Sequence, residues 1–199
     1  LSSAGADLVW TPSPEEMYPD GYQTWVSLDE LVKPLEGAMR PGHFRGVATV
    51  VSKLFNCVQP QKAFFGQKDA QQAAVIKRMT GDLNFPIELV ICPIVRAEDG
   101  LALSSRNVYL NADERQAAKV LNRSLKAAGA AYENGERDAG ALRRIMTDII
   151  SGEPLARLQY VSCADYDSLM ELEVLNGKAL LSMAVYFGKT RLIDNLVLE

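Results

Sequence analysis

Apolar residues recur at helical spacing in the stretch that follows Gly46. They stand at positions i, i+3, i+4, i+7, i+8 and i+11, on one side of a helix: Val47, Val50, Val51, Leu54, Phe55 and Val58. Gln59-Pro60-Gln61 interrupts this pattern, so we expect the helix to end there. Lys62 to Phe65 then predicts a short strand, and a second helix is predicted from about Asp69 to Thr80.

Two further apolar runs have the character of buried strands. Ile87 to Val95 is almost continuously apolar and follows a turn bracketed by Gly81 and Pro86. Such a strand suits a parallel sheet that is covered on both faces, and the strand, helix, strand order gives parallel pairing. Ala6 to Trp10 is a second short run, closed by Thr11-Pro12-Ser13-Pro14. We expect it to form a short buried strand.

The pattern changes in the second half of the chain, which becomes rich in alanine. Asn111, followed three residues later by Glu114, resembles a capping box. It predicts one helix to about Asn134, with Gly135 as its C-terminal stop. A further helix is predicted over Ala139 to Ile150.

Short strand-like runs follow these helices. They cover Leu158 to Cys163 and Lys178 to Phe187, with Asn176-Gly177 as a predicted turn between apolar stretches. The second half is therefore expected to be α+β with antiparallel strands. We expect an α/β domain with a parallel sheet over residues 1–95 and a smaller α+β domain over residues 96–199.

Composition and charge narrow the class of protein. The chain has 199 residues, a hydrophobic content of 48%, a charged content of 23% and a net charge of −4. These values fit a globular protein and give no electrostatic reason to expect a nucleic acid or an anionic membrane as partner. No apolar run approaches the ~20 residues of a membrane span. Three widely spaced cysteines and one histidine form no metal-ligand pattern, which favours reduced thiols in a cytoplasm and no protein-held metal.

A loop rich in hydroxyl and charged groups follows the predicted strand that ends at Val95. Ser104 and Ser105 supply neutral hydrogen-bond donors, and Arg106 supplies a planar cation that suits bidentate contact with phosphate. This composition is also that of an ordinary exposed turn. The loop lies at the predicted domain boundary, where ligand sites tend to occur.

A second candidate segment joins the first predicted strand to its helix. Gly66 allows close approach of a ligand, Lys68 can neutralise phosphate, Asp69 can accept hydrogen bonds from ribose, and Gln72 lies one turn further on. The carboxyl end of a strand and the start of a helix is where α/β sheets bind ligands. The alternative is that Asp69 caps the helix and that Lys68 is solvated.

Four segments of the chain resemble one known family. They are PGHFRGV at 41–47, FFGQKDAQQ at 64–72, DGLALSSRN at 99–107 and RLIDN at 191–195. With these motifs in this order, the chain from about Ala4 onward resembles the pantothenate synthetases, which are pantoate:beta-alanine ligases. The resemblance implies a Rossmann-like nucleotidyltransferase domain with a smaller C-terminal domain that folds over the active site. It also implies that pantoate attacks the α-phosphate of Mg-ATP to form pantoyl adenylate, from which beta-alanine displaces AMP.

The family resemblance also assigns residues to substrates. The catalytic, phosphate-binding residues are Lys68, Ser104, Ser105 and Arg106, the last three within the counterpart of a mobile KMSKS loop over 99–107. The remaining ATP contacts are Gly66 and Asp69 at the ribose, and Val95 and Leu103 around the adenine. The pantoate contacts are Gln72 and an apolar wall of Val47 and Val50. Glu36, Arg40 and His43 lie in the family pattern without an assigned role, and a structural role for His43 stays open.

Two departures from the family pattern stand out. Gln67 occupies a position where the family commonly has Glu. The family pattern also contains a Met-Gly-x-Leu-His-x-Gly-His motif, a further pantoate-binding glutamine and an acidic residue linked to magnesium. None of these is present here, and the paired histidines cannot lie elsewhere, because the chain has one histidine. We therefore expect a fragment with little or no ligase activity alone, from a parent enzyme that is a cytoplasmic homodimer.

Two alternatives to this hypothesis remain. The chain could be a non-catalytic fragment that keeps partial affinity for nucleotide or associates with a complementary segment. It could also belong to a related nucleotidyltransferase that adenylates another carboxylic acid. A P-loop kinase and a dinucleotide oxidoreductase are disfavoured, since neither GxxxxGK[ST] nor GxGxxG occurs.

Overall fold

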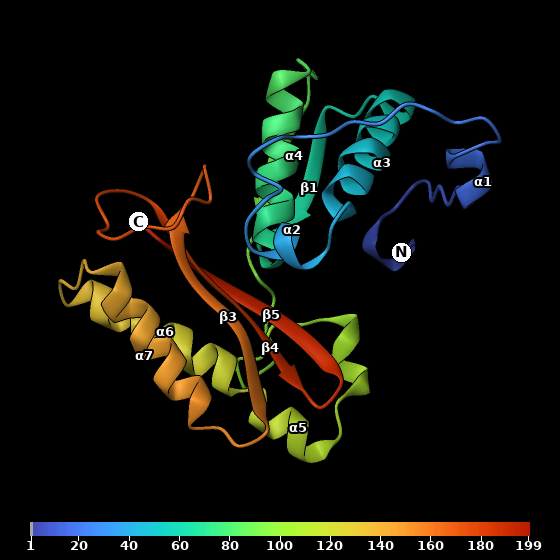
Figure 1. Cartoon of the computed structure of the whole chain (residues 1–199). Coiled ribbons are helices and arrows are strands. Elements are labelled where there is room, and N and C mark those ends of the chain that lie inside the picture. Colours follow the sequence, from blue (N-terminus) through green and yellow to red (C-terminus); the bar gives the residue numbers. More distant parts are fainter. Residues whose placement is uncertain (1) are drawn as a thin grey trace.

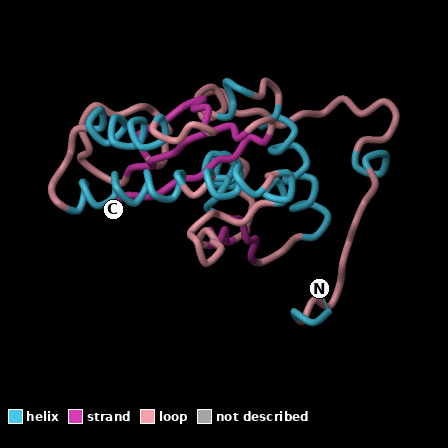
Figure 2. The backbone as a smooth tube through the Cα atoms, turned by 90° about the horizontal axis from the view of Figure 1, so that it is seen from below, coloured by secondary structure: helices cyan, strands magenta, loops and turns pink. Residues whose placement is uncertain are grey.

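The computed structural model describes residues 2–199, which form an upper and a lower part in Figure 1. The upper part contains η1 (Ser2–Ala4), α1 (Pro14–Met17), α2 (Glu36–Met39), α3 (His43–Val58), β1 (Lys62–Gly66), η2 (Gln67–Asp69), α4 (Ala70–Asp82) and β2 (Glu88–Cys92). The lower part contains η3 (Ser105–Tyr109), α5 (Ala112–Ala117), α6 (Val120–Glu133), α7 (Ala139–Ser151), β3 (Ala156–Asp165), β4 (Ala179–Phe187) and β5 (Thr190–Leu198). The N-terminus and the stretch that leads to α1 extend to one side of the upper part in two perpendicular views (Figure 1 and Figure 2), and α1 contacts α3 where Lys53 Nζ donates to Met17 O.

The upper part is built on a parallel pair of strands. β1 and β2 pair from Lys62 opposite Glu88 to Gly66 opposite Cys92, and α4 connects them. α3 and α4 cover one face, where Phe65 packs among buried residues of both helices. The parallel β-α-β unit is thus confirmed. The expected cover on both faces is wrong for the described residues, because Phe64 on the opposite face is 65% exposed.

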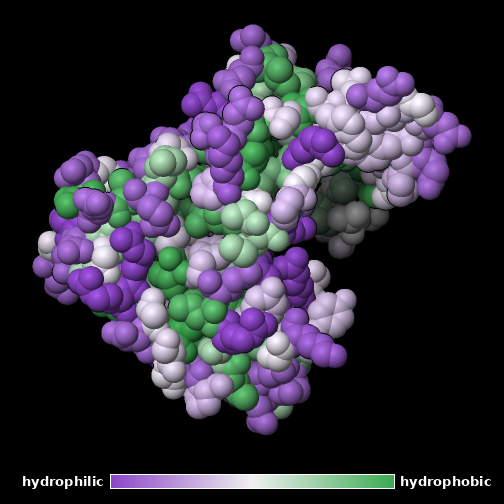
Figure 3. All heavy atoms as spheres, in the orientation of Figure 1, coloured by the Kyte–Doolittle hydropathy of each residue, from purple (hydrophilic) through white to green (hydrophobic). Residues whose placement is uncertain are grey.

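The prediction of a buried strand over Ala6 to Trp10 is also wrong. These residues have no regular secondary structure, and Leu8 is 85% exposed. A strand needs a hydrogen-bonded neighbour, and within residues 2–199 the parallel sheet consists of β1 and β2 alone. The apolar composition of this segment is therefore not enough to form a strand when no neighbouring strand pairs with it. Figure 3 shows a largely hydrophilic surface on which apolar residues are visible over α4 and in the lower part.

The predicted helices of the upper part are confirmed with shifted ends. α3 begins at His43 rather than near Gly46, after Gly42 in the left-handed conformation, and it ends where Gln59 adopts the same conformation. The apolar side of α3 packs against α4 with Phe55 and Met79 in one cluster. This packing fixes the direction in which α4 leaves the end of β1.

The long helix predicted from Asn111 is two helices. The capping box between Asn111 and Glu114 is present, so the start was correct. The backbone hydrogen bonds then change from a spacing of four residues to one of three, where Lys119 N donates to Gln116 O and Leu121 N donates to Ala118 O. This tight turn separates α5 from α6. The stop at Gly135, with φ of 99°, and the next helix are confirmed.

The lower part is an antiparallel sheet in the order β3-β4-β5, with α6 and α7 packed together against it (Figure 1). β5 was not predicted. Its hairpin with β4 turns through Gly188 and Lys189, where Gly188 has φ of 55°. The turn predicted at Asn176-Gly177 is only a bend before β4. None of the helices described in residues 2–199 has both the length and the apolar character needed to cross a membrane.

Candidate active site

A cavity of about 220 Å³ lies between the two parts of the molecule. Its walls come from the α2–α3 region, the start of α4, the loop before η3 and the strands β3, β4 and β5. Six residues that the family resemblance assigned to a substrate line it: Lys68, Asp69, Gln72, Ser104, Ser105 and Arg106. The structure therefore brings together two loops that are well separated along the chain.

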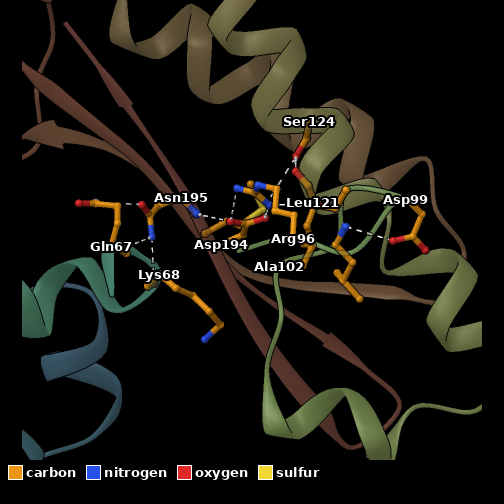
Figure 4. Close-up of polar contacts among 12 residues, drawn as sticks. Gln67, Lys68, Arg96, Asp99, Ala102, Leu121, Ser124, Asp194 and Asn195 are labelled. Atoms are coloured by element: carbon orange, nitrogen blue, oxygen red, sulfur yellow. Dashed lines mark hydrogen bonds and ion pairs between the residues drawn. The ribbon is translucent and has the colours of Figure 1, made fainter. Parts of the chain in front are cut away.

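The first loop continues directly from the end of β1. Lys68 and Asp69 lie in η2, and Figure 4 shows the backbone of Lys68 beside Asn195 of β5. Within residues 2–199, the Lys68 Nζ has its nearest carboxylate oxygen, Oδ2 of Asp69, at 3.9 Å. The Asp69 side chain makes no capping hydrogen bond to α4. Asp69 therefore occupies the N-cap position of α4 without a side-chain capping hydrogen bond, and its carboxylate remains available to a ligand.

Gly66 lies where β1 gives way to η2. Its φ of −82° is accessible to any residue, and a Cβ built there meets no described atom within 4 Å. Neither backbone conformation nor packing within residues 2–199 requires glycine at this position. The open space beside Gly66 leaves room for a ligand close to the backbone.

The second loop is held at its base by backbone contacts. Arg96 and Ala102 form an isolated antiparallel bridge, and Leu103 N donates to Val95 O at 2.9 Å. Ser104 Oγ accepts the N–H of Arg106 at 3.2 Å, which fixes the start of η3. Ser105 and Arg106 are exposed residues that line the cavity, and Arg106 Nη1 donates to Arg191 O at 3.4 Å.

Five predicted residues do not line this cavity. Val47 and Val50 pack in the apolar clusters around α3, and Val95 and Leu103 are exposed on the surface, as is Gly66. Their assignments to pantoate, adenine and ribose stay predictions.

A buried ion pair across the cavity was not predicted from the sequence. Glu36 is 8% exposed, and its carboxylate accepts hydrogen bonds from Nη1 and Nη2 of Arg191 at 2.7 and 2.6 Å. Tyr160 Oη donates to the same carboxylate at 2.9 Å, and the Glu36 N–H donates to Gln71 Oε1 at 2.9 Å. No local pattern indicates this contact, because Glu36 and Arg191 are 155 residues apart.

The charges in this cluster are set by their surroundings. Burial by itself would raise the pKa of Glu36, but the hydrogen bonds and positive charge of Arg191 outweigh it and lower that pKa. Burial and the neighbouring Glu36 carboxylate raise the pKa of Tyr160. At neutral pH the cluster therefore contains a carboxylate, a guanidinium and a neutral phenol.

His43 and Arg40 form a second polar contact at the cavity. The Arg40 Nη1 lies 2.9 Å from Nε2 of His43. Since a guanidinium can only donate, this nitrogen must be the unprotonated acceptor of a neutral imidazole. Burial lowers the pKa of His43, and the charge of Arg40 acts in the same direction. A structural partner for His43 is thus present, while its ring also lines the cavity.

A parallel β-α-β unit with a cation-bearing loop at its strand end, closed by an antiparallel sheet with a second such loop, defines a nucleotidyltransferase-like α/β protein. The family model for pantoate-beta-alanine ligase matches residues 1–197, and the chain belongs to this family of ligases. Pantothenate synthetase from Roseiflexus sp. is 58% identical over 199 residues, which are 100% of this chain and 72% of that relative.

Solved structures agree with the sequence comparison. Pantothenate synthetase from Thermus thermophilus superposes with a TM-score of 0.93 and 45% identity, over 98% of this chain and 71% of that one. The pantoate-beta-alanine ligase from Francisella tularensis gives a TM-score of 0.74 and 31% identity, over 98% and 66%. That ligase is described as complexed with beta-gamma ATP and beta-alanine. The Rossmann-like, nucleotidyltransferase fold expected from the motifs is confirmed.

Proposed function

We propose that this protein serves the ATP-dependent condensation of pantoate with beta-alanine to pantothenate, through a pantoyl adenylate. The observation that carries the proposal is the meeting of Lys68, Gln72 and Arg106 at one cavity, although they come from separate motifs. Membership of the ligase family and the ATP complex of the Francisella relative support it.

The reaction has two balanced steps. A carboxylate oxygen of pantoate attacks the α-phosphorus of ATP, and the bond from that phosphorus to the bridging oxygen breaks to release pyrophosphate. The amine nitrogen of beta-alanine then attacks the acyl carbon, AMP leaves, and the amine loses a proton to solvent. Both steps move negative charge onto a leaving group, so positioned cations and hydrogen-bond donors lower the barrier.

The residues of the cavity fit these demands. Lys68 and Arg106 stabilise the phosphate charge as it moves to pyrophosphate, and Ser104 and Ser105 donate hydrogen bonds to phosphate oxygens. Mg²⁺ enters as part of the substrate Mg-ATP, with its charge on the phosphates. Residues 2–199 contain no group of three His, Cys, Asp or Glu side chains arranged to hold a metal ion.

The remaining contacts follow the family assignment. Asp69 and the backbone at Gly66 hold the ribose, and Val95 and Leu103 border the adenine. Gln72 holds pantoate, with Val47 and Val50 as the apolar wall. Residues 96–199 act as a domain that folds over the nucleotide domain of residues 1–95 and excludes water, which would hydrolyse the acyl adenylate.

The 199 residues by themselves have little or no ligase activity in this proposal. The paired-histidine motif of the family is not part of this sequence, whose one histidine is His43. A site that lacks some of its positioned groups loses most of its rate. A homodimeric, cytoplasmic enzyme as the working form belongs to the same proposal.

The test measures exchange of labelled pyrophosphate into ATP in the presence of pantoate. It uses the polypeptide encoded by the complete reading frame, with the 199-residue chain assayed in parallel. We expect Lys68→Ala and Arg106→Ala to lower the exchange rate at least ~10²-fold. Lys126→Ala, a change at an exposed residue of α6, is the matched control.

Three results would contradict these assignments. Unchanged exchange in either variant would refute the role of that residue. Exchange with a different carboxylic acid and none with pantoate would favour the related nucleotidyltransferase instead. Turnover of the 199-residue chain near that of a full-length pantothenate synthetase would refute its inactivity, and calorimetry with ATP would show whether it binds nucleotide.

A further inference from the structure

Strand β5 carries two consecutive polar residues whose side chains are buried, Asp194 and Asn195. Buried polar groups are stable only when they are hydrogen-bonded, so their partners indicate why they are there. Successive side chains of a strand point to opposite faces. Figure 4 shows that Asn195 reaches the loop of Lys68, whereas Asp194 reaches Arg96.

Asn195 is bound on all sides by the loop between β1 and α4. Its Nδ2 donates to the backbone oxygens of Gln67 and Lys68 at 3.0 and 2.9 Å. Its Oδ1 accepts Nε2 of Gln67 at 3.1 Å. Because both amide protons and the amide oxygen are used, the orientation of this side chain is fixed. The backbone of Lys68 is thereby held against β5, 127 positions away in the sequence.

Asp194 supports the base of the other loop. Its carboxylate accepts Nη1 and Nη2 of Arg96 at 2.6 and 2.9 Å, and its side chain has 0% exposure. Arg96 Nη1 also donates to Gly100 O at 3.1 Å, so the same guanidinium holds the loop that leads to Ser104. One dipeptide of β5 thus contacts both loops that line the cavity.

We propose that Asn195 is a positioning residue that places Lys68 for the adenylyl-transfer step, while Asp194 supports the second loop through Arg96. The inference rests on the proposed function, since Lys68 must act on the substrate for its position to matter. Asn195 itself acts through the backbone of Lys68. A displacement of about 1 Å at a reacting group is enough to lower a rate by about 10²-fold.

The experiment follows pyrophosphate exchange with pantoate in the polypeptide of the complete reading frame. Asn195→Ala is expected to lower kcat about ten- to a hundredfold, with KM for pantoate within about twofold. Asn195→Asp, which keeps the volume but replaces the donor by an acceptor, should lower kcat similarly and provides a second variant if Ala does not fold. Ile150→Val destabilises the fully buried core of the lower part and should leave kcat unchanged.

A double variant separates positioning from general structural damage. If Asn195 acts through Lys68, Asn195→Ala should have no further effect on kcat in a Lys68→Ala background. Multiplied losses in the double variant, or full activity of Asn195→Ala, would overturn the inference and leave the proposed function standing. A wild-type polypeptide without pantoate-dependent exchange would overturn the proposed function and this inference with it.

Discussion

Removing the positive charge of Arg191 tests how the two walls of the cavity are held together. Arg191→Met keeps most of the apolar stem and leaves Glu36 buried without its cation. The side chains of Arg191 and Glu36 are 14% and 11% exposed, so water screens the pair only weakly. Tyr160 still donates one hydrogen bond to the stranded carboxylate.

The expected loss of stability is large for a single substitution. Breaking a buried pair by removing one partner costs about 3–5 kcal/mol, and the remaining Tyr160 bond places this case near 3 kcal/mol. For a chain of this length, 1 kcal/mol corresponds to a Tm change of about 2–4 °C, which gives a decrease of about 6–12 °C. Urea unfolding and thermal unfolding of the 199-residue chain measure both quantities.

The dependence on pH identifies the carboxylate as the origin of the loss. In the wild type the pKa of Glu36 is lowered, so its contribution to stability is present above the usual glutamate pKa and is lost as pH falls through the lowered value. In Arg191→Met, burial acts without the cation and raises that pKa, which destabilises the fold above about pH 4.3. The stability difference between wild type and variant should therefore narrow as pH falls from about 7 toward about 4.

A companion substitution provides the control. Glu36→Gln removes the charge that Arg191→Met leaves stranded, so the double variant should be more stable than Arg191→Met alone. Three results would each refute the reasoning: strictly additive stability losses in the double variant, a stability loss below about 1 kcal/mol for Arg191→Met, or a stability difference between wild type and Arg191→Met that does not change with pH.

Two further predictions concern residues outside the cavity. Burial raises the pKa of Cys163 to about 11 while Cys57 is exposed, so iodoacetamide at about pH 8 should modify Cys57 first and Cys163 only after unfolding. Early modification of Cys163, seen by peptide mass spectrometry, would contradict this. Gly188→Ala should cost at least about 1 kcal/mol, because φ is 55° and the new Cβ would collide with the Glu114 carboxylate. The cost should be smaller in a Glu114→Ala background; an equal cost would exclude the collision.

Helices were predictable where the signals for them are local. The periodicity after Gly46 and the capping box at Asn111 each involve residues within a few turns of one another. The break between α5 and α6 was not predictable in this way, since alanine-rich sequence favours a continuous helix. It arises where Ala117 and Ala118 are buried against the lower core, so tertiary packing overrides local propensity.

The same difference between local and long-range signals applies to the candidate site. Lys68 and Arg106 could be found because each lies in a compact motif with a recognisable family pattern. The Glu36–Arg191 pair could not, since only folding brings these residues together, and a carboxylate and a guanidinium 155 positions apart carry no joint signal. The run Ala6 to Trp10 shows the converse, because apolar character predicts burial but not the neighbour that a strand requires.

Strand β5 was not predicted because two polar residues at its centre contact the loops that line the cavity. Residues 190–198 contain apolar side chains on both sides of Asp194 and Asn195, but these two buried polar residues interrupt the run at its centre, where a sheet core normally has apolar side chains. Their cost of burial is offset by the Arg96 ion pair and by hydrogen bonds to the loop of Lys68. A prediction from the hydrophobic pattern fails where residues needed at a site interrupt that pattern. Asp194 and Asn195, which interrupt the apolar pattern of β5, are therefore also the residues that join it to the loops lining the cavity.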